Sequence, residues 1–172
     1  GSAFKPFVYA AALENGFKPN DLILDAPFVL DQNKGEFKWK PSNYGKKFYG
    51  LNTFRSGIEK SKNLTTVRIA QKVGLDKINS ISKKLNIYNE PIQILSYSLG
   101  SGETNLINLA SAYASFVNGG KKISPTLIDH IQDQNGKTIF KNKKIECNGC
   151  NKDYLKGKPP TIKYNFEQVF SD

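Results

Sequence analysis

The sequence has few residues that could build a metal centre and no apolar stretch that could cross a membrane. It contains 1 His and 2 Cys in 172 residues. A zinc site built on the two cysteines would need two more ligands, which one histidine does not supply. The longest apolar stretch, residues 7–13, falls far short of the roughly 18 apolar residues of a membrane span. We therefore predict no metal, no cofactor, and a soluble chain in the form given.

Recognisable targeting and repeat patterns are also missing. The chain opens on Gly1-Ser2-Ala3-Phe4-Lys5 and not on a basic segment followed by an apolar one, so it shows no secretory signal. It has no internal repeat and no low-complexity segment. A length of 172 residues with 38% hydrophobic content is enough for one core, and one domain is the default expectation.

The charge is strongly positive. The chain has 25 Lys and Arg against 15 Asp and Glu, a net charge of +10, which attracts anionic polymers or anionic lipid headgroups. No motif of a nucleic-acid-binding fold accompanies this charge, so we predict no nucleic-acid partner. The lysine-rich segment at residues 141–163 leaves one alternative open, a non-catalytic module that docks on a membrane or a polymer.

The two cysteines lie in Cys147-Asn148-Gly149-Cys150, a spacing shared by zinc half-sites, redox pairs and local disulfides. A thioredoxin-like pair is expected near a βαβ pattern, whereas these surroundings are typical of a polar loop. We predict a disulfide that staples this loop in an oxidising compartment, with two free thiols as the alternative.

Periodicity and turn residues predict an α+β chain that is mostly helical, with a small antiparallel hairpin. Helices are expected where apolar residues recur at helical spacing and end near glycine. Residues 17–50, rich in Pro, Gly and aromatics, are expected to form loops and short strands. The expected helices are 2–15, 53–60, 64–73, 76–85 and 106–117, and the expected hairpin joins 123–133 to 137–140 through Gln134-Asn135-Gly136.

A serine and a lysine stand three residues apart in Ser2-Ala3-Phe4-Lys5. On a helix, side chains at i and i+3 can meet, so the amine could take the proton of the hydroxyl. Lysine can do this only if burial or cationic neighbours lower its pKa from about 10.4 toward neutrality. The pattern alone is weak, because Ser80-Ile81-Ser82-Lys83 also fits it, as the expected polar face of a helix.

A second motif follows about sixty residues after Ser2. Ser61-Lys62-Asn63 is the only Ser-x-Asn sequence in the chain, and it falls at an expected junction between helices. Serine and asparagine both favour the start of a helix, so by itself this tripeptide would be interpreted as a cap.

The residues around both motifs resemble the transpeptidase domains of class A penicillin-binding proteins, members of the serine β-lactamase and penicillin-binding superfamily. The resemblance extends to about Phe140. It is carried by Gly1-Ser-Ala-Phe-Lys-Pro-Phe-Val-Tyr, Ala12-Leu-Glu-Asn-Gly16, Trp39-Lys-Pro-Ser-Asn-Tyr44, Tyr49-Gly-Leu-Asn-Thr-Phe-Arg55, Ser61-Lys-Asn-Leu-Thr-Thr-Val-Arg-Ile-Ala70, Leu99-Gly-Ser-Gly-Glu103 and Leu109-Ala-Ser-Ala-Tyr-Ala-Ser-Phe-Val-Asn-Gly-Gly120.

The resemblance implies an incomplete β-lactamase/transpeptidase-like fold and assigns roles to four residues. Ser2 would attack the D-Ala-D-Ala amide of a peptidoglycan stem peptide, and its backbone N–H would form half of the oxyanion hole. Lys5 would accept the proton of Ser2, Ser61 would relay a proton to the leaving amine, and Asn63 would hold the substrate amide and position Lys5. Trp39 and Tyr44 are candidates for lining the substrate cleft, with the alternative that Trp39, the single Trp of the chain, belongs to the core.

The same resemblance implies partners and a location. β-Lactams would be trapped covalently at Ser2, and the parent protein would carry a membrane anchor and a glycosyltransferase domain at the periplasmic or extracytoplasmic face of the bacterial inner membrane. We expect residues 1–140 to be a partial transpeptidase domain and residues 141–172 a lysine-rich surface excursion. A relative of the same fold that hydrolyses or senses β-lactams is the enzymatic alternative.

The third motif of the family, Lys-Thr-Gly on an edge strand, does not occur in these residues. Gly136-Lys137-Thr138-Ile139 approaches it, but isoleucine stands where glycine is needed, and we interpret this segment as part of the hairpin. By the resemblance, the motif is expected beyond Asp172, and this piece is expected to lack transpeptidase activity by itself.

Overall fold

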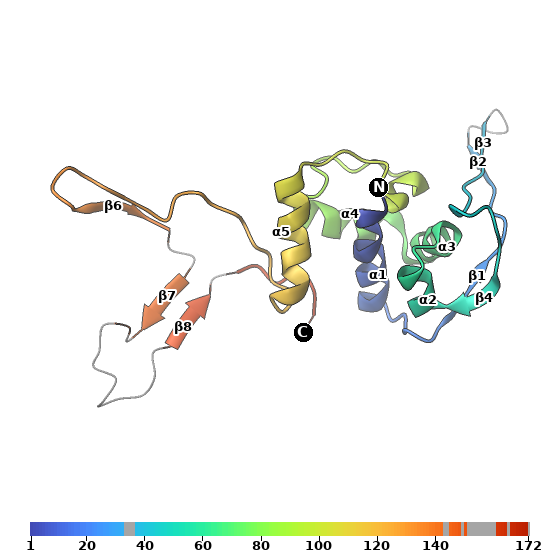
Figure 1. Ribbon diagram of the computed structural model, residues 1–172, viewed down its shortest axis with the longest axis horizontal. Helices are drawn as coiled ribbons and strands as arrows, with labels where there is room; N and C mark the ends of the chain where they lie inside the picture. Colours follow the sequence, from blue (N-terminus) through green and yellow to red (C-terminus); the bar gives the residue numbers. More distant parts are fainter. Residues whose placement is uncertain (33–36, 143–144, 149, 151–160, 165, 172) are drawn as a thin grey trace.

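An alanine-rich helix forms the centre of the fold (Figure 1). In the computed structural model, which describes residues 1–32, 37–142, 145–148, 150, 161–164 and 166–171, a short 3₁₀ turn, η1 (Ser2–Phe4), leads into helix α1 (Lys5–Glu14). Pro6 lies in the first turn, where its missing N–H is tolerated. Gly16, with φ of +88°, allows the chain to turn away after the helix. Phe7, Val8, Ala11 and Ala12 are completely buried, so α1 is a core helix.

Four further helices, a second 3₁₀ turn and eight short strands complete the described part of the chain. The helices are α2 (Phe54–Glu59), α3 (Asn63–Val73), α4 (Leu75–Lys84) and α5 (Leu106–Val117), and the turn is η2 (Leu95–Leu99). The strands are β1 (Leu22–Asp25), β2 (Leu30–Gln32), β3 (Phe37–Trp39), β4 (Gly50–Thr53), β5 (His130–Gln132), β6 (Thr138–Lys141), β7 (Ile145–Asn148) and β8 (Thr161–Tyr164). The strands form the antiparallel pairs β1–β4, β2–β3, β5–β6 and β7–β8.

The other helices surround α1. Helices α2, α3 and α4 contact it directly, and α5 lies beside it through the ring contacts of Phe7 with Tyr113 and Phe116 (Figure 1). Apolar side chains of α3, including Leu64, Val67 and Ile69, are fully buried. Packing of this kind between apolar helix faces is the main source of helical stability in a folded protein.

A close approach of α2 to the core requires glycine at one position. A Cβ atom at Gly57 would lie 2.5 Å from Tyr9 Oη and 2.6 Å from Thr65 Cγ2. Gly57 is therefore needed for the packing between α2, α1 and α3.

The α+β class predicted from the sequence is confirmed, and the helices fall close to their expected ranges. The expected hairpin forms as β5–β6, with Gly136 at φ of +79° in the turn, although β5 covers only the end of the range 123–133. The described residues contain three further antiparallel pairs, and β1, β2 and β3 lie in the range 17–50, where short strands were expected. The β7–β8 pair spans the tail that the sequence predicted to be a loop, and both hairpins extend away from the helices (Figure 1). No helix in the described ranges is long and apolar enough to cross a membrane.

Candidate active site

The structure brings Lys5 together with Ser61 and Asn63. Lys5 Nζ donates hydrogen bonds to the carbonyl oxygen of Ser61 at 2.6 Å, to Ser61 Oγ at 3.0 Å and to Asn63 Oδ1 at 2.6 Å. Lys5 is the first residue of α1, and Asn63 is the first residue of α3. Contact between these two helices therefore assembles a cluster from residues separated by 56 and 58 positions in the sequence.

Burial of Lys5 changes its acid–base behaviour. The side chain is only 2% exposed, and desolvation lowers the pKa of its ammonium group from 10.5 to about 8. Burial penalises the charged form, so part of the population carries a neutral amine near neutral pH. A neutral amine can accept a proton, which is the property that a serine nucleophile requires of a neighbouring base.

Ser61 has an unusual backbone conformation. Its φ is +48°, in the left-handed region that residues other than glycine rarely adopt. In this conformation both its carbonyl oxygen and its hydroxyl face Lys5 Nζ. A left-handed conformation raises the energy of an L-residue by about 1–2 kcal/mol. Such strain persists only where the surroundings hold it, and it is common at functional sites.

Ser2 lies on the η1 turn, one helical turn before Lys5, and its side chain is exposed. Among the described residues its hydroxyl makes no hydrogen bond. Two distant segments hold this turn: Tyr113 Oη on α5 donates to the Ala3 carbonyl at 2.8 Å, and Gly100, with φ of +78°, lies so close that a Cβ atom would overlap the Gly1 carbonyl. The nucleophile candidate is therefore accessible on a fixed backbone.

Among the described residues, the other candidates predicted from the sequence make no hydrogen bond to this cluster. Trp39 on β3 packs edge-on against Phe28, with ring centroids 6.3 Å apart. Tyr44 projects fully into solvent, beside the buried Asn43. Contact of Trp39 or Tyr44 with a ligand stays a prediction. Ser80 and Lys83, which match the same spacing as Ser2 and Lys5, are both exposed on α4.

The structure places a disulfide between Cys147, near the end of β7, and Cys150. Whether the two thiols are oxidised in solution is a prediction that a thiol titration tests. Within the ranges that the structure describes, no group of three or more His, Cys, Asp or Glu side chains could hold a metal ion.

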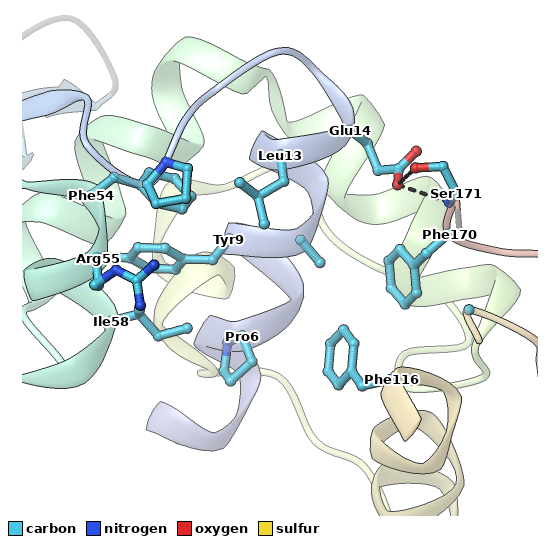
Figure 2. A pocket seen from close by; sticks show the side chains of 13 residues that line it. Pro6, Tyr9, Leu13, Glu14, Phe54, Arg55, Ile58, Phe116, Phe170 and Ser171 are labelled. Atoms are coloured by element: carbon cyan, nitrogen blue, oxygen red, sulfur yellow. Dashed lines mark hydrogen bonds between the residues drawn. The ribbon is translucent and has the colours of Figure 1, made fainter. Parts of the chain in front are cut away.

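A separate apolar groove of about 490 Å³ runs along another stripe of α1 (Figure 2). Pro6, Tyr9 and Leu13 line one side, and Phe116 and Phe170 lie across from them (Figure 2). At its edge, the Ser171 hydroxyl donates to Glu14 Oε1 at 2.6 Å. None of Ser2, Lys5, Ser61 and Asn63 lines this groove. The groove is therefore separate from the candidate active site.

Comparison with known proteins identifies the class that the fold and the site define. The family described as "Penicillin binding protein transpeptidase domain" matches residues 1–152. The chain therefore belongs to the penicillin-binding protein transpeptidase family. Within it, the chain is 50% identical over 151 residues to penicillin-binding protein 1A of Rickettsia conorii, covering 88% of this chain and 19% of that protein. Penicillin-binding protein 1A of Pseudomonas aeruginosa is 33% identical over 141 residues, covering 81% and 17%.

Solved structures agree with this membership. The crystal structure of penicillin-binding protein 1A from Haemophilus influenzae matches with a TM-score of 0.74 and 34% identity, over 83% of this chain and 21% of that chain. The penicillin-binding protein PonA1 from Mycobacterium tuberculosis matches in fold with a TM-score of 0.75 and 19% identity, over 99% and 43%. The chain thus spans about one fifth of the length of the curated relatives it matches, such as 19% of the Rickettsia conorii protein.

Proposed function

We propose that this chain supplies the nucleophile and the proton-transfer groups of a peptidoglycan D,D-transpeptidase, with Ser2 as the residue that is acylated. The observation that carries the proposal is the convergence of Ser61 and Asn63 on Lys5 Nζ, one helical turn after Ser2. Membership of the transpeptidase family supports the same chemistry.

In the proposed reaction, neutral Lys5 accepts the proton of Ser2 Oγ as this oxygen attacks the carbonyl of the D-Ala-D-Ala amide. Ser61, 3.0 Å from Lys5 Nζ through its hydroxyl, passes a proton to the departing D-Ala amine. The acyl group stays on Ser2 until an amine of a neighbouring stem peptide attacks the ester and regenerates the serine. Asn63 positions Lys5 through the 2.6 Å hydrogen bond to its Oδ1.

We propose further that β-lactams acylate the same serine. The structure of PonA1 from Mycobacterium tuberculosis was solved in complex with penicillin V, and penicillin-binding protein A from the same organism was solved as an imipenem acyl-enzyme complex. These proteins share 22% and 18% identity with this chain. Their fold likeness supports the proposal, while the relatives named penicillin-binding protein 1A favour an extracytoplasmic place of action for the whole protein.

Labelling with a fluorescent penicillin tests the proposal. We expect the full-length protein that contains this chain to be labelled, the variant Ser2→Ala to lose the label, and the matched variant Ser80→Ala to keep it. Ser80 is the control because it has the same spacing to a lysine but lies exposed on α4. Labelling that persists in Ser2→Ala would contradict the assignment. We expect the 172-residue chain alone to remain unlabelled, since it contains no Lys-Thr-Gly sequence.

A further inference from the structure

A carboxylate is buried beneath the Ser61–Asn63 turn. Asp25, the last residue of β1, is 0% exposed. Its Oδ1 accepts a hydrogen bond from Asn43 Nδ2 at 2.7 Å, and its Oδ2 lies 3.2 Å from Lys62 Nζ. An unpaired charge at such a depth is strongly destabilising. The two partners of Asp25 are therefore tightly constrained in position.

Asn43 connects this carboxylate to the start of α3. Its Oδ1 accepts the backbone N–H of Asn63 at 2.9 Å and that of Leu64 at 3.3 Å. The residue before the helix, Lys62, gives no side-chain cap. Asn43 thus caps α3 from a distant loop, and the N–H groups that it satisfies would otherwise lack an intrahelical partner.

Lys62 fixes the middle of the tripeptide from the other side. Its ammonium group lies between Asp25 and the ring of Tyr49, 4.3 Å from the ring centroid. The Lys62 side chain is held by Asp25 and Tyr49, whereas the neighbouring Ser61 and Asn63 contact Lys5. The tripeptide is therefore clamped on one side and presents its polar groups to Lys5 on the other.

Asp25 and Asn43, which we call the clamp residues, hold a turn whose backbone is strained at Ser61. Ser61 keeps φ of +48°, a conformation that persists only when surrounding contacts hold it. The contacts of Asn43 and Asp25 are made one to three residues further along the chain, at Lys62, Asn63 and Leu64.

We propose that Asp25 and Asn43 are positioning residues, which hold the Ser61–Asn63 turn against Lys5 and thereby set the rate at which Ser2 is acylated. This inference rests on the proposed function. Neither residue touches the reacting atoms; both act through Lys62 and the first residues of α3. Loss of either clamp residue lets Ser61 and Asn63 move relative to Lys5, and misplacement by about 1 Å can slow an enzyme about 100-fold.

The test is the kinetics of acylation of the full-length protein by a fluorescent penicillin. Rapid mixing over a range of concentrations separates the dissociation constant of the first complex from the first-order rate constant of acylation. The final labelled fraction reports how much protein is folded and competent. For Asn43→Ala and Asp25→Asn we expect a fall of about 10- to 100-fold in the rate constant, with the dissociation constant and the labelled fraction close to those of the wild type.

Asn52→Ala is the matched control. Asn52 makes comparable side-chain hydrogen bonds, its Nδ2 donating to the Ile23 carbonyl at 3.0 Å, but none to residues 61–63. We expect Asn52→Ala to leave the rate constant unchanged. A second readout is rescue: Asp25→Asn leaves the Lys62 ammonium unpaired, so Asp25→Asn with Lys62→Met should recover part of the lost rate.

The outcomes separate the two proposals. If the single variants do not fold, Asp25→Asn with Lys62→Met decides, because it keeps the size and shape of the buried Asp25 side chain and leaves no buried charge unpaired; its rate constant should still lie below that of the wild type. A purely structural role predicts a smaller labelled fraction with an unchanged rate constant, and that result would overturn the inference. A wild-type protein that is not labelled at Ser2 would overturn the proposed function itself, and this inference with it.

Discussion

Lys5 Nζ lies 2.6 Å from Asn63 Oδ1, and this contact joins the first residue of α1 to the first residue of α3. Two short segments with weak individual signals thus become one site. The hydrogen bond constrains the lysine side chain, and the burial that accompanies it lowers the pKa of the ammonium group to about 8.

The lowered pKa of Lys5 predicts a pH dependence. Only the neutral amine can accept the proton of Ser2, so acylation of the full-length protein by penicillin should accelerate as the pH rises through about 8 and then level off. Lys5→Arg should abolish this acceleration and nearly all labelling, because a guanidinium stays protonated. Lys83→Arg, at the exposed second Ser-x-x-Lys sequence, is the control and should keep the wild-type profile. A flat profile in the wild type would argue against Lys5 as the base.

The left-handed backbone of Ser61 predicts an unusual order of stability. Ser61→Ala and Ser61→Gly both remove the hydroxyl that contacts Lys5, but only glycine adopts φ of +48° without strain. The glycine variant of the 172-residue chain should therefore be more stable than the alanine variant by about 1 kcal/mol, measured by urea unfolding. The same pair of changes at Ser56, inside α2, should show the opposite order, since glycine destabilises a helix interior. If the glycine variant were more stable than the alanine variant at both positions, or less stable at both, the backbone strain at Ser61 would be contradicted.

The close approach at Gly57 predicts that even one methyl group is disruptive. Gly57→Ala would bring a Cβ atom to 2.5 Å from Tyr9 Oη, so α2 must shift. We expect a loss of about 1–3 kcal/mol in the free energy of unfolding, measured by thermal or urea denaturation. Gly45→Ala is the control, because no heavy atom lies within 4 Å of its Cβ position. Its effect should stay within about 0.5 kcal/mol; comparable losses at both sites would contradict the packing described.

The cysteine pair predicts the result of a thiol titration. Protein purified without reductant and then denatured should show no free thiol, and reduction before the titration should release two. Cys147→Ser is the control and should expose one thiol, that of Cys150, without reduction. Two free thiols in unreduced wild-type protein would contradict the disulfide and weaken the extracytoplasmic assignment.

Local signals in the sequence were sufficient for the helices. The apolar spacing before Gly16 predicted α1, and the positive φ of that glycine explains why the helix stops there. The Asn135-Gly136 turn likewise predicted the β5–β6 hairpin. The β7–β8 pair was missed because its lysine-rich, proline-punctuated surroundings carry the composition of a surface loop.

Parts of the site had no comparable signal. Asn43 stood within a stretch that resembled the family but had no assigned role, and Asp25 looked like any charged residue near a strand end. Their importance follows from their burial and from partners that are distant in the sequence. Asn43 is 18 positions from Asp25, and Lys62 lies further still from Asp25 along the chain. Tyr113, whose hydroxyl holds the Ala3 carbonyl from 110 positions away, escaped notice for the same reason.

By itself the sequence determined the helical framework, the family and the two motifs, because helix periodicity and motif spacing depend on neighbouring residues. Only the tertiary structure decided which groups Lys5 contacts, how far its pKa falls and which way Ser61 turns. Desolvation and hydrogen bonding at this lysine depend on the packing of α1 against α3. That packing depends on many contacts between residues that are far apart in the sequence. No single local sequence pattern predicts it.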